Sequence, residues 1–419
     1  MRGRDRIKSA LTHRETDKVP VDFGSTGVTG IHVLAVARLR EFYGLEKRPV
    51  KVVEPYQMLG EVDGRLGEIL GVDTAGMAGR QTMFGFPNRD WKEWRAPWGQ
   101  EVLVPGLFKT STDKDSSILI HPQGDRSSPP SGRMPPTGYF FDAIIRQLPI
   151  DETRLDPEDN LQEFAPISEE DLAHWRGEAK KLRASDKGVI ASFGGTGLGD
   201  IALVPGLSLK RPRGIRDVAE WYVSTLTRQE YIHRIFERQT EIALLNLEKI
   251  YHVVGDIIEA AFVCGTDFGT QTSLFSSPEA FDALYGPYYK IINGWIHERT
   301  TWKIFKHSCG AVEPLIKRFI DCGFDILNPV QISAEGMNPE FLKNTYGDKI
   351  VFWGGGVDTQ KTLPFGTPDD VEKEVLRHCE IFAPGGGFVF NTVHNIQANV
   401  PVANIAAIFT ALRKFSGWT

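Results

Sequence analysis

A histidine and a cysteine stand two positions apart in the segment FKHSCG, as His307 and Cys309. Side chains at i and i+2 of an extended segment point to the same face, so an imidazole nitrogen and a thiolate can reach one cation. Zinc is the usual cation for such donors, and a catalytic zinc takes three protein ligands and keeps a fourth position open. His394, in FNTVHNIQ, is the best-placed third ligand. The alternative for the pair alone is a core cysteine beside a hydrogen-bonded histidine.

Two aspartates directly follow apolar runs, Asp267 in CGTDFGTQ and Asp358 in WGGGVDTQ. Each is a candidate catalytic residue, as a general acid or base, a substrate anchor or a further ligand. Each could equally cap a turn or a helix. For Asp358 the two interpretations are balanced. For Asp267 the catalytic one is favoured, because the next helix is expected to begin later, with Ser277 as its N-cap and Pro278 in its first turn.

Neutral amides occur near the same segments, and their donors and acceptors suit an uncharged polar substrate. The candidates for substrate binding are Asn328 and Gln331, in LNPVQ, and Gln397, which follows His394. Amides are also common in turns. The glycine clusters match neither a P-loop nor a GxGxxG motif that enters a helix after the first strand, so no nucleotide site is expected.

The elements that must bring these residues together are short apolar runs that alternate with helical segments, a pattern typical of parallel α/β folds. Eight runs with intervening helices predict one (β/α)8 TIM barrel over residues 1–419, in which active sites lie at the carboxyl ends of the strands. Among the helices we expect 57–70, 228–253, 278–299 and 401–415. The predicted strands are 19–24, 72–77, 187–197, 255–265, 302–310, 324–331, 349–358 and 386–395.

More than 100 residues separate the starts of the second and third predicted strands, which is too long for an unstructured loop inside a domain. Within this stretch, 89–108 holds three tryptophans and an alternating apolar run, and 121–141 is rich in Pro, Gly and Ser. These features predict a hairpin or small sheet followed by an ordered loop. We therefore expect 80–165 to be a β-rich insertion between strands 2 and 3, over the barrel mouth. It could act as a lid or as a stabilising flap.

The composition is that of an ordinary globular protein. The chain has 419 residues, 41% hydrophobic and 24% charged, and its 48 basic and 54 acidic side chains give a net charge of −6. This balance offers no electrostatic reason to expect nucleic acid or an anionic membrane as a partner. Four cysteines are too few for a disulfide framework, no apolar run is long enough to span a membrane, and the charged N-terminus does not resemble a signal peptide. A cytoplasmic protein is expected.

The sequence resembles the uroporphyrinogen decarboxylase superfamily, and within it the corrinoid-dependent methyltransferase branch. The resemblance rests on RDRIKSALTHRETDKVPVDFG, GEVDGRLGEILGVDTAGM, CGTDFGTQ, KHSCGAVEPLIKRFIDCGFDILNPVQ and the FWGGGVDTQ to FVFNTVHNIQ tail. It implies a (β/α)8 barrel. The porphyrinogen decarboxylases use arginines just after the first strand, but this chain has DFGSTGVTGIH there, so activity on uroporphyrinogen is not expected.

The methyltransferases of this superfamily bind zinc through an HxC pair and a later cysteine. His307 and Cys309 match the pair, and His394 stands where the later cysteine is expected. The resemblance thus implies methyl transfer between a small methylated substrate, such as a methoxy compound, or a thiol acceptor, and a corrinoid carried by a separate small protein. A homodimer is also plausible by resemblance.

Two other functions stay open at this point. One is a metal-free decarboxylase or lyase of the same superfamily, in which Asp267 and Asp358 do the acid–base work. The other is a binding protein without catalysis that uses the barrel mouth and the insertion as a sensor. Retained activity in Cys309→Ser together with lost activity in Asp267→Asn would identify the lyase. Tight binding without turnover would identify the sensor.

Overall fold

Seven parallel strands form the central sheet in the order β3, β10, β11, β12, β13, β14, β15. The computed structural model describes residues 1–193 and 197–417, so the end of the predicted strand 187–197, at 194–196, lies outside the described residues. Five of the six neighbouring pairs are consecutive strands of the chain, and the sixth, β3 with β10, is separated by the insertion. The strands are Thr74–Ala78 (β3), Gly188–Ser192 (β10), Ala260–Cys264 (β11), Lys303–His307 (β12), Ile326–Asn328 (β13), Val351–Trp353 (β14) and Phe388–Val389 (β15).

The segment around Val21 closes this sheet into a barrel. Val21 forms a parallel bridge with Phe390, just past β15, and its carbonyl accepts the N–H of Asp73, just before β3, at 2.8 Å. The predicted first strand, 19–24, therefore occupies the eighth position, although only one residue of it is a regular bridge. The predicted (β/α)8 barrel is confirmed.

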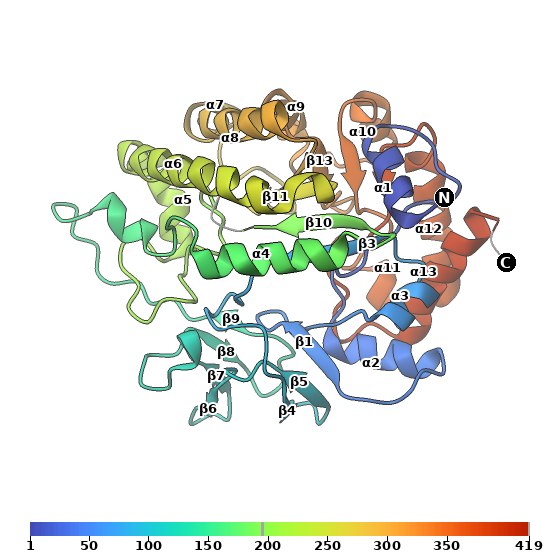
Figure 1. Ribbon diagram of the computed structural model, residues 1–419, viewed down its shortest axis with the longest axis horizontal. Coiled ribbons are helices and arrows are strands. Elements are labelled where there is room, and N and C mark those ends of the chain that lie inside the picture. The colour runs from blue at the N-terminus through green and yellow to red at the C-terminus, as the bar shows by residue number, and fades with distance from the viewer. Residues whose placement is uncertain (194–196, 418–419) are drawn as a thin grey trace.

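Helices surround the barrel (Figure 1). The predictions 228–253 and 401–415 correspond to α6 and α13, whereas 278–299 is two helices, α7 and α8, because Pro287 lacks the N–H that would continue the ladder. The α-helices are Gly3–Leu11 (α1), Val33–Phe42 (α2), Gly64–Ile69 (α3), Glu169–Leu182 (α4), Val218–Thr227 (α5), Gln229–Val254 (α6), Pro278–Leu284 (α7), Gly286–Arg299 (α8), Glu313–Asp321 (α9), Pro339–Tyr346 (α10), Thr362–Phe365 (α11), Pro368–Phe382 (α12) and Val402–Phe415 (α13). Within the described ranges, every helix is too short or too polar to cross a lipid bilayer.

The inside of the barrel is filled by alternate strand residues, and α1 closes its amino end. Ile7 of α1 packs against Gly188, the first residue of β10, where a Cβ atom would lie 2.8 Å from the isoleucine side chain. The carboxyl ends of the strands are left as the accessible end, where Val28 and Phe262 are only partly buried against this interior cluster. The cluster consists of Ile7, Ala10, Leu11, Ile190, Ala260, Phe305, Ile326, Val351, Trp353 and Val389.

Two small sheets lie together below β3, β10 and α4 in Figure 1. The first has the order β2, β1, β5, β4, and the second the order β6, β7, β8, β9. The first sheet recruits β1 and β2 from before β3, so the helix predicted over 57–70 is wrong in its first half and α3 begins only at Gly64. The strands are Val50–Glu54 (β1), Leu59–Gly60 (β2), Lys92–Arg95 (β4), Glu101–Val104 (β5), Thr110–Thr112 (β6), Ile118–Ile120 (β7), Gly132–Met134 (β8) and Asp142–Ala143 (β9).

The insertion packs against segments that follow the first and last barrel strands. His32 accepts the N–H of Leu34 on Nδ1 and donates from Nε2 to the carbonyl of Tyr139 at 2.8 Å. The adjacent Ile31 forms a parallel bridge with Ile396, beyond β15. His32 thus helps to hold the insertion at the carboxyl end of the barrel.

Candidate metal site at the barrel mouth

Three side chains from distant parts of the chain meet at the carboxyl ends of β12 and β15. His307 is the last residue of β12, Cys309 follows in the next loop, and His394 lies beyond β15. Their ligand atoms all lie within 4.8 Å of one another. His307 Nε2 lies 3.5 Å from Cys309 Sγ, and the two imidazole centroids are 5.4 Å apart. The residues expected to bind a metal are therefore close enough to share one ion.

The spacing of these atoms fits zinc. Zinc–nitrogen bonds of about 2.05 Å and a zinc–sulfur bond of about 2.3 Å put nitrogen and sulfur about 3.6 Å apart around a tetrahedral ion. The 3.5 Å between His307 Nε2 and Cys309 Sγ matches that edge. The third donor lies within 4.8 Å, so closing on one ion requires a side-chain movement of up to about 1.5 Å.

Burial keeps His307 and His394 in the neutral form, which is the form that binds a metal. It lowers the pKa of His307 and of His394 to about 4, so both imidazoles are neutral at neutral pH and have a lone pair to donate. Burial also raises the pKa of the Cys309 thiol, and the nearby Asp267 carboxylate raises it further. The thiol therefore keeps its proton until a bound cation displaces it.

The turn after Cys309 depends on glycine. Gly310 has a φ of 95°, and a Cβ atom there would lie 2.3 Å from the backbone of Gly269. The loops that follow β11 and β12 cross at this point, and Ala311 donates its N–H to the carbonyl of Thr270 at 2.8 Å. Two glycines thus let the loop that carries Asp267 lie directly against the loop that carries Cys309.

Asp267 lies beside the three candidate ligands. Its Oδ1 accepts the backbone N–H of Cys309 at 2.7 Å and lies 4.0 Å from His307 Nε2. Burial raises the pKa of Asp267, against the hydrogen bond from Cys309. A second carboxylate, Asp200, accepts the N–H of Gly265 at 3.0 Å, and burial raises its pKa to about 6. Two carboxylates therefore lie on neighbouring loops, Asp267 beside the ligands and Asp200 against the backbone of Gly265.

The remaining predicted site residues bond mainly to other protein groups. Asp358 Oδ1 accepts the backbone N–H groups of Gln360 and Lys361, which is the bonding of a turn. Gln331 accepts the N–H of Gly310 at 2.8 Å and donates to Gln271.

Asn328 is fully buried, with its amide bonded to His307 and to the carbonyl of Trp353. Gln397 is half-buried, and its Nε2 reaches the carbonyl of Asn395 at 3.4 Å. The structure brings Asn328 and Gln331 to the candidate metal site, in contact with its ligands or with the loop that carries them.

Lys306 was missed by the sequence analysis. It is fully buried between His307 and the helices, and its Nζ donates to the carbonyls of Thr266 and His307, each at 2.7 Å. Aromatic rings surround the ammonium group at 5.0–5.8 Å. The signal available in the sequence was a lysine within the predicted strand 302–310. It directly precedes His307 and so points to the opposite face of the strand. The rings belong to Phe268, Tyr289 and Phe319.

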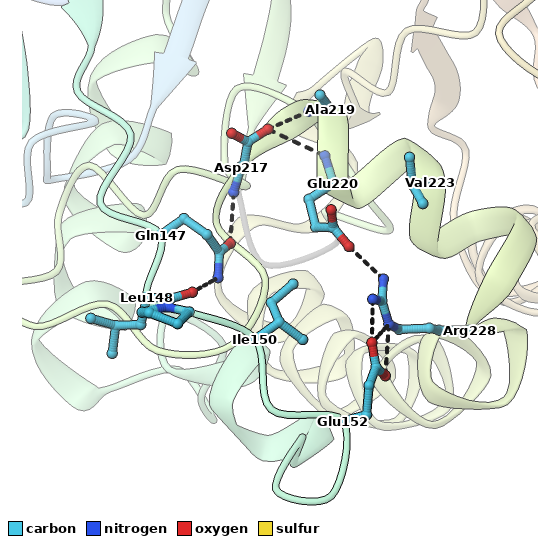
Figure 2. Close-up of a pocket in the computed structure, with 10 residues that line it drawn as sticks. Gln147, Leu148, Ile150, Glu152, Asp217, Ala219, Glu220, Val223 and Arg228 are labelled. Atoms are coloured by element: carbon cyan, nitrogen blue, oxygen red, sulfur yellow. Dashed lines mark hydrogen bonds and ion pairs between the residues drawn. The ribbon is translucent and has the colours of Figure 1, made fainter.

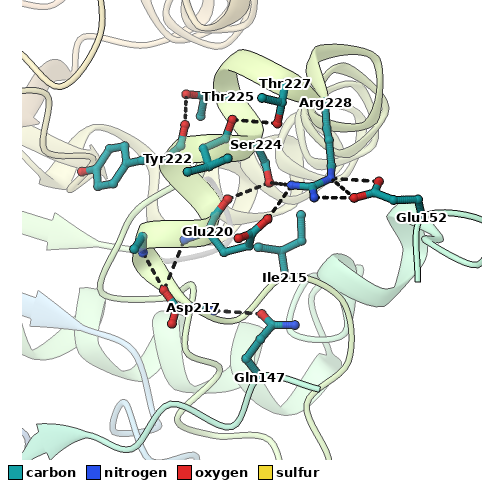
Figure 3. Close-up of polar contacts among 12 residues, drawn as sticks. Gln147, Glu152, Ile215, Asp217, Glu220, Tyr222, Ser224, Thr225, Thr227 and Arg228 are labelled. Atoms are coloured by element: carbon teal, nitrogen blue, oxygen red, sulfur yellow. Dashed lines mark hydrogen bonds and ion pairs between the residues drawn. The ribbon is translucent and has the colours of Figure 1, made fainter. Parts of the chain in front are cut away.

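Tyr222 was also missed, because it lies on α5, a helix that was not predicted. Its hydroxyl donates to the carbonyl of Asp267 at 3.0 Å, and its ring stacks on Phe275 at 4.3 Å. In Figure 3 it extends from the opposite side of the helix to Arg228. Asp217 caps this helix by accepting the N–H of Ala219 at 2.7 Å.

A separate hollow of about 680 Å³ lies on the other side of α5 (Figure 2). Arg228 bridges Glu152, in the last part of the insertion, and Glu220 of α5, and Gln147 accepts the N–H of Asp217 at 3.0 Å. These bonds hold this part of the insertion on α5, the helix whose Tyr222 contacts Asp267 beside the candidate metal site. The hollow is lined by Gln147, Leu148, Pro149, Ile150, Glu152, Asp217, Ala219, Glu220, Val223 and Arg228.

Comparisons with known proteins agree with the sequence resemblance. Residues 212–415, which include all three candidate ligands, match the model of the family described as uroporphyrinogen decarboxylase. Uroporphyrinogen decarboxylase from Sodalis glossinidius is 33% identical over 70 residues, which are 17% of this chain and 19% of that protein. The enzyme from Pseudoalteromonas translucida is 31% identical over 80 residues, 19% of this chain and 22% of that protein. The matched segments thus span about a fifth of each curated relative.

A solved structure extends the likeness to the whole chain. A methyltransferase from Methanosarcina mazei superposes with a TM-score of 0.54 over 99% of both chains, at 14% sequence identity. At this identity the likeness shows a shared fold. With the family match, it confirms the resemblance to the uroporphyrinogen decarboxylase superfamily.

Proposed function

We propose that this chain, whose residues 212–415 carry the uroporphyrinogen decarboxylase domain, is a zinc-dependent methyltransferase. It would move a methyl group between a small methylated substrate, such as a methoxy compound, or a thiol acceptor, and a corrinoid held by a separate small protein. The convergence of His307, Cys309 and His394 within 4.8 Å carries this proposal. The fold shared with the Methanosarcina mazei methyltransferase supports it.

The three ligands and their neighbours have distinct roles in this proposal. His307, Cys309 and His394 would hold the ion, and a bound zinc would supply Lewis acidity toward the heteroatom that loses or gains the methyl group. Asp267 fixes the backbone N–H of Cys309 and so sets the direction of the thiolate. Tyr222 holds the backbone at Asp267 in place through its hydrogen bond to the aspartate carbonyl.

The carboxyl groups of Asp200 and Asp267 can donate or accept the proton that accompanies methyl transfer. Departure of a methyl group from an oxygen leaves a basic alkoxide that must be protonated, and use of a thiol as acceptor releases a proton. Asp200, whose pKa burial raises to about 6, can give or take a proton close to neutral pH. Burial also raises the pKa of Asp267, which favours its protonated form on the ligand side of the site.

Zinc analysis of the purified chain tests the metal part of the proposal. We expect about one zinc per chain after expression with added zinc, and loss of that zinc in His307→Ala, Cys309→Ser and His394→Ala. Cys322→Ala is the control, because Cys322 is a free cysteine that lies away from the ligands, at the end of α9. Markedly substoichiometric zinc in the wild-type chain would contradict the proposal.

Methyl transfer itself is tested with free methylcobalamin as a surrogate for the corrinoid protein and a panel of thiols as acceptors. The spectrum of the corrinoid reports loss of its methyl group. We expect turnover that depends on zinc and is lost in Cys309→Ser. If Cys309→Ser keeps the activity found for the chain while Asp267→Asn loses it, the metal-free lyase is the correct alternative.

A further inference from the structure

Asn328 connects one candidate ligand to the wall of the barrel. It is the last residue of β13 and is fully buried. Its Oδ1 lies 2.6 Å from Nδ1 of His307, on the neighbouring strand β12. Its Nδ2 donates to the backbone carbonyl of Trp353, on β14, at 2.9 Å. The Asn328 amide therefore bonds to both strands that neighbour β13, namely β12 and β14.

The carbonyl of Trp353 fixes which way the amide points. A carbonyl oxygen can only accept, so the Asn328 atom that faces it must be the NH2 group. The atom that faces His307 is then the amide oxygen, which can also only accept. Nδ1 of His307 must therefore carry the hydrogen, and the lone pair of the neutral ring lies on Nε2. Nε2 is the atom that lies 3.5 Å from Cys309 Sγ.

We propose that Asn328 is a positioning residue that holds His307 in its Nδ1-protonated tautomer, with Nε2 aimed at the metal. This inference rests on the proposed zinc site and assigns Asn328 a role other than substrate binding. The amide sits where many metal sites place a carboxylate or a carbonyl behind the ligating histidine. Because Asn328 has no exposed surface and both ends of its amide are engaged, it has no free group for a substrate.

The second histidine lacks such a partner. Within residues 1–193 and 197–417, no hydrogen bond reaches the His394 ring; its backbone carbonyl accepts one from Thr392. His307 is thus the preorganised ligand, and His394 is the one whose ring is free to turn onto the ion. This asymmetry predicts that removing the Asn328 oxygen damages zinc binding through His307 alone.

Zinc affinity in three variants tests the inference. The dissociation constant is measured by competition with a chromophoric chelator, which does not depend on catalysis. Asn328→Ala removes both bonds and should weaken zinc binding about 10–100-fold, the usual effect of losing an outer partner of a ligating histidine. Asn328→Asp keeps an acceptor for His307 Nδ1–H but loses the donor to Trp353, and should stay within about 10-fold of wild type.

Asn293→Ala is the matched control, because Asn293 is a buried asparagine that donates to a backbone carbonyl, that of Cys322, away from the site. It should keep wild-type affinity. If Asn328 only supports the fold, Asn328→Asp binds zinc as weakly as Asn328→Ala, since both lose the bond to Trp353. Equal weakening, or wild-type affinity in Asn328→Ala, overturns the inference. If the wild-type chain itself binds no zinc, the proposed function fails instead.

The tautomer can also be read without any variant of Asn328. The chain has 10 histidines, and nitrogen-15 labelling of histidine with assignment through His307→Gln identifies the His307 signals. We expect the hydrogen on Nδ1 in the zinc-free protein. A hydrogen on Nε2 would overturn the inference even if the alanine variant does not fold.

Discussion

Replacement of Lys306 by methionine should destabilise the fold, although it removes a buried charge. The ammonium group donates to the carbonyls of Thr266 and His307, and the lysine side chain has no exposed surface. Methionine fills a similar volume and offers no donor, so both carbonyls lose this bond. These carbonyls belong to the residue before Asp267 and to the ligand His307, so the bonds fasten the two loops of the metal site together.

The size of the effect follows from two opposing contributions. A buried acceptor that loses its donor costs about 1–3 kcal/mol, so two carbonyls cost about 2–6 kcal/mol. The methionine sulfur gains about 0.3–1.5 kcal/mol against the surrounding aromatic rings. The net loss is therefore centred near 3 kcal/mol. With an unfolding entropy of about 2.1 cal/mol/K per residue, the 419-residue chain should melt about 3–4 °C lower.

Thermal unfolding of the zinc-free protein measures this difference without a contribution from metal binding. Lys317→Met is the control, because Lys317 is 72% exposed and pairs with Asp321 one turn away. Its melting temperature should change by less than about 1 °C. If Lys306→Met melts within about 1 °C of wild type, or higher, the cost of burying the ammonium group outweighs its two bonds and the reasoning is refuted.

Three further predictions concern other residues. The bond from Arg6 holds the pKa of Asp17 below its ordinary value. The ionised Asp17 therefore stabilises the fold fully above its unfolded pKa of about 4, and this stabilisation is lost as the pH falls through the lower folded pKa. The difference in melting temperature between wild type and Asp17→Asn should therefore narrow below about pH 4. Gly310→Ala should melt several degrees lower and lose zinc, whereas Gly294→Ala, where a Cβ atom meets nothing within 4 Å, should not melt lower. Asp358→Ala should melt about 1 °C lower and keep its zinc; loss of zinc would place Asp358 in the site.

The barrel strands could be predicted because their surroundings are nearly uniform. A strand that is covered on both faces needs a continuous apolar run, and β10 and β14 each show one. The strand β1 lacks that property. It pairs with β5, about fifty residues later, and three of its five residues are only partly buried, so no local pattern distinguishes it from a loop.

The error over 57–70 has a local cause. The apolar residues of this segment recur at helical spacing, but Leu59 and Gly60 pair with β1 instead. The helix starts after Asp63, whose side chain accepts the N–H of Leu66 at 3.1 Å. This N-cap was visible in the sequence, and it should have outweighed the periodicity of the residues before it.

The three candidate ligands could be predicted from where strands end, but their supporting contacts could not. The strand-end rule of barrel enzymes places His307 and His394 on one rim without any knowledge of their distance. The bond from Asn328 to His307 depends on the register of β12 against β13, in which these two residues are opposite each other. Tyr222 reaches the site only because α5 packs beside the loop that carries Asp267. Such contacts are set by tertiary packing, which a single sequence does not encode locally.

Strand order sets the distance that the third ligand must reach in this chain. Two strands, β13 and β14, separate β12 from β15, so a ligand beyond β15 must reach across the mouth to share an ion with His307. An imidazole extends farther from the backbone than a thiol, and the rings of His307 and His394 approach to 5.4 Å between centroids. A cysteine at position 394 would need the ion or the loop to move toward β15. The anchoring of His307 by Asn328 opposes that movement of the ion, because it fixes the opposite ligand in place.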